Sequence, residues 1–339
     1  MLSPASECLL RSKDLFERGR WLLVNPTDTN IFQQLAGNVS GFHQYFDIYQ
    51  QALNSAPGSQ HFGLSCPERD FDGIVLYISK AKKHTEQLLH YLATLLKTNG
   101  HLFILGENKG GIKSSNKFLA NFGNKPQKID SARHCALHGV EVAQCDSNFT
   151  LSQALSWTDV EVNDVNIKVA SLPGVFSHGE LDEGTRLLLE NTESVPNGNI
   201  LDFACGAGVI GAWLHRLNPD ISLTLSDINA SALYCCEQTL KENNISGNII
   251  PSHGMRDVHG KFAAIYTNPP FHTGVKTDHS ITRDFLKAAV EQLQPQGKLI
   301  LVANRFLPYP DQMQETFGNV RKLSENGKFS LYESIFIPM

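Results

Sequence analysis

The chain has 339 residues, of which 41% are hydrophobic and 19% are charged, and its formal net charge at pH 7 is −5. This length accommodates two domains, each large enough to bury its own core, and the charge excludes a uniformly basic nucleic-acid binder but not a local basic surface. Without an apolar run of about eighteen residues or an export signal, we expect no membrane span and a cytoplasmic location.

The first half of the chain predicts an α/β domain. Apolar stretches alternate with a segment of helical period, and short turns separate them, as in a parallel sheet covered by helices on both faces. The predicted elements are strands at 20–26, 42–49, 71–80 and 100–108, with a helix at 85–96.

A β-hairpin is predicted between the halves. Residues 157–174 alternate Val and Ile with polar residues around Asn163 and Asp164, which is typical of two strands joined by a two-residue turn. We therefore expect a linker of antiparallel strands over residues 134–175.

The second half repeats the α/β pattern. Its predicted strands lie at 199–208, 221–229, 248–252, 262–270 and 297–305, with helices at 230–244 and 281–293. Trp21 and Asp47 are 26 positions apart, Ile200 and Asp227 are 27 apart, and Gly-x-Leu begins the last strand of each half. This agreement predicts a duplicated unit. The alternative is that two unrelated doubly wound domains share such spacing by geometry alone.

A glycine-rich loop follows the first strand of the second half. Gly206, Gly208 and Gly211 form a G-x-G-x-x-G pattern that opens a helix, and Asp227 ends the next strand. Glycines let a ligand approach the backbone, and an acid at that place accepts hydrogen bonds from ribose hydroxyls. The pair predicts a cofactor that contains adenosine. The alternative is a tight turn with a helix-capping aspartate.

The stretch Asn-Pro-Pro-Phe at 268–271 favours a methyl donor over a dinucleotide as the cofactor. Two prolines end the strand and make the backbone rigid, which positions Asn268 and the carbonyl of Pro269. Two acceptors there can hold the N–H groups of a planar amine so that its lone pair faces a methyl group, and Phe271 offers a face for stacking a base. A simple turn is the alternative. Asp202 supplies the polar group that the amino-acid end of S-adenosylmethionine needs.

Seven cysteines, an odd number with no Cys-x-x-Cys pair, predict reduced thiols and no metal site. One of them, Cys205, lies within the glycine loop, where we expect a small packed thiol rather than a nucleophile.

Six stretches resemble the bacterial ribosomal RNA small subunit methyltransferase C (RsmC) family, which methylates N2 of a guanine in 16S rRNA. They are residues 106–114, 129–139, 173–189, 201–211, 268–272 and 303–310, and the resemblance spans nearly the whole chain. It implies two tandem Rossmann-like class I methyltransferase domains in an α/β fold. It also implies S-adenosylmethionine as cofactor and the assembled 30S subunit as partner. We expect the chain to act as a monomer. The expected domains are 1–133 (degenerate), 134–175 (linker) and 176–339 (catalytic).

The resemblance also implies roles for single residues. The residues implied to hold the target guanine are Asn268, Pro269, Pro270 and Phe271. Asp202, Gly206 and Gly208 are implied to contact the methionine end of the cofactor, and Asp227 its ribose. Phe203 and Ile228 are implied as neighbouring cofactor contacts. Ser252, His253 and Gly254 are implied near the adenine, Asn268 also faces the cofactor, and Phe176, Asp182 and Gly184 are implied as a flap.

The first half lacks this machinery, because residues 24–29 (VNPTDT) and 76–82 (LYISKAK) stand where the loop and the clamp belong. We expect it to bind no cofactor. Residues 80–133 carry ten Lys or Arg against three acids. This excess predicts an RNA-facing surface, with an ordinary solvated face as the alternative. Its predicted contacts are Lys80, Lys82, Lys83, Lys109, Lys113 and Lys117.

Four other functions remain open from the residues. A guanine-N2 methyltransferase of 23S rRNA shares the duplicated plan, and a methyltransferase of a release-factor glutamine shares Asn-Pro-Pro but usually has Tyr where this chain has Phe271. A non-catalytic RNA-binding module would be expected to have lost some of Gly206, Asp227 and Asn268. A dehydrogenase leaves the Asn-Pro-Pro-Phe stretch without a role.

Overall fold

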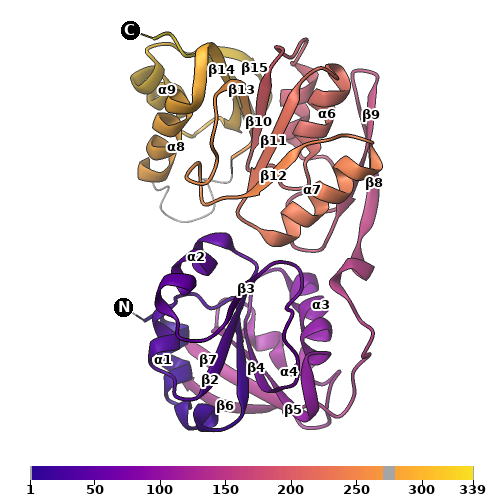
Figure 1. The fold of residues 1–339 in the computed structure, drawn as a ribbon, viewed down its shortest axis with the longest axis vertical. Coiled ribbons are helices and arrows are strands. Elements are labelled where there is room, and N and C mark those ends of the chain that lie inside the picture. Colours follow the sequence, from indigo (N-terminus) through magenta and orange to yellow (C-terminus); the bar gives the residue numbers. More distant parts are fainter. Residues whose placement is uncertain (1, 270–278, 339) are drawn as a thin grey trace. The chain divides into compact units, whose positions relative to one another are not determined.

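The computed structural model describes residues 2–269 and 279–338 and divides into two compact units. The first comprises Met1–Leu155 and Leu172–Gly174, and the second comprises Ser156–Ser171 and Val175–Met339. In Figure 1 the first runs from indigo to magenta and the second from pink to yellow. No helix within the described ranges is long and apolar enough to cross a membrane.

The first unit is built on a seven-stranded sheet of order β3-β2-β1-β4-β5-β7-β6, in which β1 to β5 are parallel and β7 and β6 are antiparallel to their neighbours. Its strands are β1 (Arg20–Val24), β2 (Asn38–His43), β3 (Gln60–Phe62), β4 (Phe71–Tyr77), β5 (Leu96–Glu107), β6 (Gln127–Ala132) and β7 (Cys135–Glu141). Its helices are α1 (Pro4–Leu10), α2 (Phe46–Ser55), α3 (Lys82–Ala93) and α4 (Ser115–Leu119), with short 3₁₀ turns η1 (Lys13–Glu17), η2 (Asn30–Gln33), η3 (Ile112–Ser114) and η4 (Leu151–Ala154).

Both faces of this sheet are buried. In β1, Leu22 and Val24 belong to one core cluster and Trp21 and Leu23 to the other, because successive side chains of a strand point to opposite faces. Strands covered on both faces read as continuous apolar runs, which is why the β1 sequence RWLLV is recognisable as a central strand.

The second unit repeats the first strand for strand, with the order β12-β11-β10-β13-β14-β16-β15. Its strands are β10 (Asn199–Phe203), β11 (Ser222–Asp227), β12 (Asn248–Pro251), β13 (Phe262–Thr267), β14 (Leu293–Asn304), β15 (Arg321–Glu325) and β16 (Phe329–Ile335). Its helices are α5 (Glu183–Glu190), α6 (Val209–Leu217), α7 (Ala230–Glu242), α8 (His279–Gln292) and α9 (Tyr309–Phe317). The matching orders confirm the predicted pair of similar α/β domains.

One detail of the predicted duplication is wrong. The second strand of the first unit ends at His43, so Asp47 is not at a strand end but in the first turn of α2. Tyr45 has extended backbone angles and caps that helix, as Asn229 caps α7, and each cap follows the last strand residue by two positions. His43 is therefore the counterpart of Asp227. The aromatic run at 42–49 hides this break between strand and helix.

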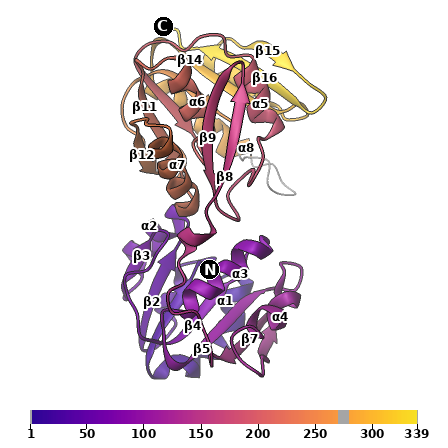
Figure 2. The same cartoon turned by 90° about the vertical axis from the view of Figure 1, so that its right-hand side faces the viewer.

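The predicted hairpin is present as β8 (Ser156–Val162) and β9 (Val165–Ser171). Asn163 and Asp164 both have positive φ, 49° and 61°, which is the geometry of a two-residue type I′ turn. The hairpin packs against α6 and α7 (Figure 2), and Trp213 Nε1 donates to the Val162 carbonyl at 3.2 Å.

The units also divide at a different place from the predicted linker. The linker was expected to begin at residue 134, but β7 pairs with β5 inside the first sheet, so the first unit continues to Leu155. The hairpin belongs to the second unit. The hydrophobic pattern of β7 (CALHGVE) gives no sign of which sheet it joins, because pairing partners are not encoded in local sequence.

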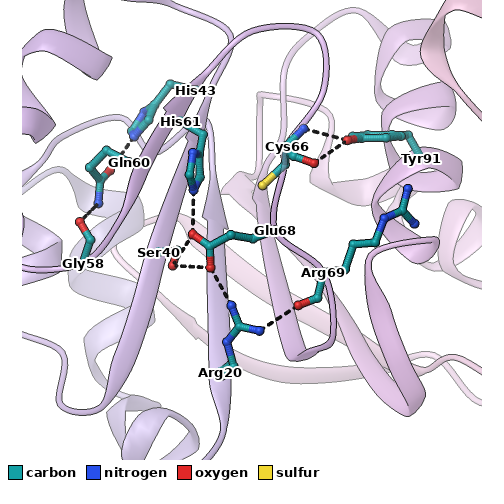
Figure 3. Close-up of polar contacts among 10 residues, drawn as sticks. All are labelled: Arg20, Ser40, His43, Gly58, Gln60, His61, Cys66, Glu68, Arg69 and Tyr91. Atoms are coloured by element: carbon teal, nitrogen blue, oxygen red, sulfur yellow. Dashed lines mark hydrogen bonds and ion pairs between the residues drawn. The ribbon is translucent and has the colours of Figure 1, made fainter.

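A polar cluster joins three neighbouring strands of the first unit (Figure 3). The Glu68 carboxylate accepts from Arg20 Nη2 at 2.5 Å, pairs with His61 Nε2 at 2.6 Å and accepts from Ser40 Oγ at 3.4 Å. Partial burial acts to raise the pKa of Glu68, but the His61 and Arg20 partners outweigh it and hold that pKa below its usual value. We assign this cluster a structural role at the β3 edge of the sheet.

Candidate functional site

Three glycines follow β10, and each is required for a different reason. Gly206 has a φ of +54° and open space where a Cβ would stand, so its backbone is accessible. At Gly208, with a φ of +77°, a Cβ would lie 2.8 Å from Cys236 Sγ, and at Gly211 a Cβ would lie 2.6 Å from Leu225 Cδ2. The loop therefore exposes backbone at Gly206 and allows close packing against α7 at Gly208 and against β11 at Gly211.

The acid after β11 joins the glycine loop directly. Asp227 Oδ2 accepts from the Gly206 backbone N–H, and Oδ1 accepts from that of Asn229, both at 2.9 Å. Burial raises the pKa of the Asp227 carboxyl. A carboxylate has about four lone-pair sites, so two hydrogen bonds leave capacity for the hydroxyls of a ribose. The predicted pairing of loop and acid is thus a physical contact.

Asp202 lies beneath the same loop and is fully buried. Its Oδ2 accepts from the Gly211 N–H at 2.8 Å, whereas its Oδ1 has no hydrogen-bond partner among the described residues. Burial, reinforced by the nearby Asp227, raises the pKa of Asp202 to about 7. A buried carboxylate oxygen without a donor is costly, and a ligand carrying an ammonium group would satisfy it.

Asn268, the predicted clamp residue, is held by Asp182, for which the resemblance implied only a place in a flap. Asn268 Nδ2 donates to Asp182 Oδ2 at 2.8 Å and to Thr185 Oγ1 at 3.0 Å. Asp182 also caps α5, because its Oδ2 accepts from the Thr185 N–H at 2.9 Å. With the NH₂ group directed to these two acceptors, the other branch of the Asn268 amide, Oδ1, is the acceptor left to face a substrate.

Asn268 reaches this edge because β13 is fixed to β10. Thr267 Oγ1 donates to the Phe203 carbonyl at 2.8 Å, and Thr267 pairs with Phe203 in the sheet. Pro269 is buried. The predicted base-contacting residues Pro270 and Phe271 lie outside the described residues.

The loop after β12 lies next to Asp227. Ser252 is buried, its N–H donates to the Asp227 carbonyl at 3.0 Å, and its Oγ donates to the Gly254 carbonyl at 2.7 Å. His253 N–H donates to Asp257 Oδ2 at 3.1 Å. Gly254 has a φ of +64° and open space at its Cβ position. The predicted ribose and adenine contacts therefore lie on adjoining backbone.

The remaining predicted residues divide between core and surface. Phe203 is buried and stacks on Phe285 with ring centroids 4.5 Å apart, so its side chain belongs to the core. Gly184 is buried beneath Phe329, and Ile228 is half-buried between Asp227 and the helix cap. Phe176 is 61% exposed and thus stands apart from these contacts.

Sequence reasoning missed Thr185 and Asp257, which hold Asn268 and the Ser252 loop. Each follows a predicted residue by three to five positions, and only the Asp182–Thr185 spacing of a helix cap gave a signal. Cys205 has a hydrogen bond with Cys236, which together with burial raises the pKa of the Cys205 thiol well above its usual value. This agrees with a packed thiol. Among the described residues no group of side chains suits a metal ion.

The six predicted RNA-contacting lysines are all exposed, and none forms an ion pair with another described residue. They follow the carboxyl ends of β4 and β5, which are neighbouring parallel strands, and they are Lys80, Lys82, Lys83, Lys109, Lys113 and Lys117. Other basic residues of the segment 80–133 are paired with acids. Lys97 forms an ion pair with Asp72 and Arg133 forms one with Glu7, each at 2.9 Å.

Comparisons with known proteins agree on the family. Residues 166–333 match the family described as methyltransferase small domain, and residues 6–157 match the methyltransferase small domain N-terminal family. Relatives named ribosomal RNA small subunit methyltransferase C include those of Pseudoalteromonas atlantica (48% identical) and Pseudomonas aeruginosa (39%), each alignment covering 98% of this chain and 99% of the relative.

A solved structure has the same fold. It is described as T. thermophilus 16S rRNA N2 G1207 methyltransferase (RsmC) in complex with AdoMet and guanosine. Its TM-score is 0.85 at 18% identity, over 98% of this chain and 92% of that one. Both units of the present chain are thus found together in a known protein.

Proposed function

Because the chain belongs to the ribosomal RNA small subunit methyltransferase C family, we propose that it transfers a methyl group from S-adenosylmethionine to N2 of a guanine in 16S rRNA. The observation that carries this proposal is the orientation of Asn268, whose NH₂ group faces Asp182 and Thr185. This orientation gives Oδ1 the role of acceptor toward an exocyclic amine.

The residues around the glycine loop fit S-adenosylmethionine. The partnerless Oδ1 of Asp202 suits an ammonium group, and Asp227 has lone pairs left for ribose hydroxyls. The open backbone at Gly206 and Gly254 admits close approach. When bound, this cofactor supplies a methyl group attached to a positively charged sulfur.

Residues of this chain would bind and orient the guanine amine that accepts the methyl group. The lone pair of a guanine amine is delocalised into its ring, which makes it a weak nucleophile. Asn268 Oδ1 and the Pro269 carbonyl each accept one N–H, which directs the lone pair out of the ring and stabilises the positive charge that grows on nitrogen. No side chain needs to form a covalent intermediate or remove a proton before transfer.

The partner that best suits this site is 16S rRNA in the assembled 30S subunit, acted on by a monomer in the cytoplasm. The structural neighbour is described as acting on G1207, and a guanine of that type is the proposed target here. The exposed lysines Lys80, Lys82, Lys83, Lys109, Lys113 and Lys117 are the proposed phosphate contacts.

The proposal is tested by offering radiolabelled S-adenosylmethionine with unmodified 30S subunits, 50S subunits or naked 16S RNA, followed by nucleoside identification. Label in N2-methylguanosine of the 30S subunit is expected. Label in 50S alone would instead assign the chain to 23S rRNA. Label in none of the RNAs would refute RNA methylation and lead to release factors as substrates.

A further inference from the structure

A cavity of about 230 Å³ lies in the first unit, at the carboxyl ends of β1 and β4. In an open α/β sheet this is the edge where ligands bind. The cavity occupies, in the first unit, the position that the glycine loop and Asn268 occupy in the second. It is lined by the loop after β1, by Tyr45, which precedes α2, by Ile48 of α2, and by residues of the segment from Leu76 to Leu88. A single water molecule takes up about 30 Å³ of liquid, so the space is large enough for a ligand.

The lining is largely apolar with a few neutral polar groups, and no Asp, Glu, Lys or Arg is among its residues. Asn25, Thr27 and Ser79 contribute neutral polar groups, and burial lowers the pKa of His84, so that ring is neutral at physiological pH. A charged group placed inside would have no counter-charge. The lining therefore fits a neutral ligand and disfavours a phosphate, a carboxylate or the charged end of S-adenosylmethionine.

Several polar atoms at this cavity lack hydrogen-bond partners among the described residues. Thr85 lines the cavity and is 1% exposed, yet its Oγ1 has no partner, and the same holds for Ser79 Oγ. Behind them, Gln44 Oε1 lies 3.0 Å from His84 Nε2 and 3.1 Å from Asn25 Nδ2, while Gln44 Nε2 has no partner. Buried donors and acceptors are normally satisfied, so this group points to a ligand that carries both kinds of atom.

Basic side chains lie around the cavity rather than in its lining. Lys80, Lys82 and Lys83 immediately follow Ser79 and are exposed. The loop after β5, which carries Lys109 and Lys113, lies alongside, because a Cβ at Gly111 in that loop would stand 3.7 Å from the Ser79 carbonyl oxygen. A neutral cavity with basic residues at its edge matches one nucleotide, whose base is neutral and whose phosphates are anionic.

We propose that this cavity receives one unpaired nucleobase of the substrate RNA, with the neighbouring phosphates on Lys80, Lys82 and Lys83. Thr85 Oγ1 and Ser79 Oγ bond the base edge, and Tyr45, 40% exposed, offers a ring face for stacking. This assignment rests on the proposed function in that the partner is taken to be RNA. The degenerate unit thereby reads a second base while the other unit modifies the target guanine.

The test compares the affinity of full-length variants for the RNA of unmodified 30S subunits, measured by co-sedimentation over a range of salt concentrations. Ile48→Trp fills the cavity, and Leu53→Trp, at a 54% exposed position of the same helix, is the matched control. Because a stacked base would be lost, we expect the RNA affinity of Ile48→Trp to be lower than that of the wild type by about tenfold or more. The slope of log affinity against log salt should stay unchanged, because no phosphate contact is removed. The control should bind as wild type.

Thr85→Val provides a second variant in case the tryptophan disturbs folding. It preserves shape and removes a hydroxyl that has no partner in the free protein, so stability should hold while RNA affinity falls about 3- to 10-fold, as for one lost hydrogen bond. Wild-type affinity in both variants would overturn the proposal. So would saturable binding of free adenosine that Ile48→Trp abolishes without affecting RNA, which would make the cavity a small-molecule site.

Methyl transfer by the wild-type protein is measured separately. Normal transfer with RNA affinity insensitive to both variants refutes the base cavity alone. Absent transfer, with affinity that falls in the variants, refutes the proposed methylation while supporting the cavity.

Discussion

Asp182 and Asn268 lie 86 positions apart in the chain, and a hydrogen bond of 2.8 Å from Asn268 Nδ2 to Asp182 Oδ2 joins them. The same oxygen caps α5 through the Thr185 N–H. One carboxylate thus fixes both the start of a helix and the orientation of the amide proposed to hold the substrate amine.

We predict that Asp182→Ala lowers kcat about 10- to 100-fold, because Asn268 loses the acceptor that orients its amide. Loss of the cap also costs about 1 kcal/mol of unfolding free energy. Asp182→Asn is the matched control, since its single oxygen can accept both hydrogen bonds, and it should retain most activity and stability. Steady-state kinetics and urea unfolding measure both quantities. Equal activity in the two variants would show that Asp182 does not position Asn268.

The buried Asp202 predicts a pH dependence of stability. Its pKa is raised to about 7, so the folded state binds a proton that the unfolded state, with an ordinary pKa near 3.9, releases. The unfolding free energy should therefore fall as pH rises from about 4 to 7, with a slope of up to about 1.4 kcal/mol per pH unit. Urea unfolding at pH 5 and pH 7.5 without cofactor measures the loss. Asp202→Asn should show a smaller decrease than wild type; an identical decrease would place its origin elsewhere.

The exposed lysines predict the salt dependence of RNA binding. Changing both Lys113 and Lys117 to Glu should weaken RNA binding. Because each lysine is proposed to contact one phosphate, the slope of log affinity against log salt should become less steep by about 1 to 2. The control reverses Lys241 and Lys287, exposed residues of the second unit, and changes the net charge equally. Similar effects in both double variants would mean that total charge, not this surface, governs binding.

Cofactor binding should be confined to the second unit. In the first unit His43 stands where Asp227 stands in the second, and its Nε2 is 2.7 Å from Gln60 Oε1. We therefore predict one S-adenosylmethionine per chain by isothermal titration calorimetry, and no saturable binding by Asp227→Ala at cofactor concentrations that saturate the wild type. A stoichiometry of two would contradict the degenerate assignment of the first unit.

Much of the fold was predictable because strands buried on both faces have a strong local signal. The run at 20–26, the glycine loop and the hairpin turn at Asn163 and Asp164 all mark their elements correctly. The end of β2 was not predictable, because an aromatic segment with buried residues reads equally as strand or helix. Likewise β7 was assigned to the linker, since which strands pair is decided by the whole sheet.

The site followed the same division. The positions of the loop, Asp202 and Asp227 were predictable because they lie at the ends of strands that have a strong local sequence signal. The contact between Asp182 and Asn268 was not, because it depends on how α5 meets the sheet across 86 positions. A resemblance to known enzymes implied Asp182 as a flap residue, whereas in the structure it accepts a hydrogen bond from Asn268.

The most direct test of this account is single-turnover methyl transfer to unmodified 30S subunits by wild type and Asn268→Ala, with S-adenosylmethionine affinity measured in parallel. We predict N2-methylguanosine from the wild type, and a rate at least about 100-fold lower in Asn268→Ala with cofactor affinity nearly unchanged. A variant that transfers methyl at the wild-type rate would contradict the role of Asn268, and with it the proposed clamp.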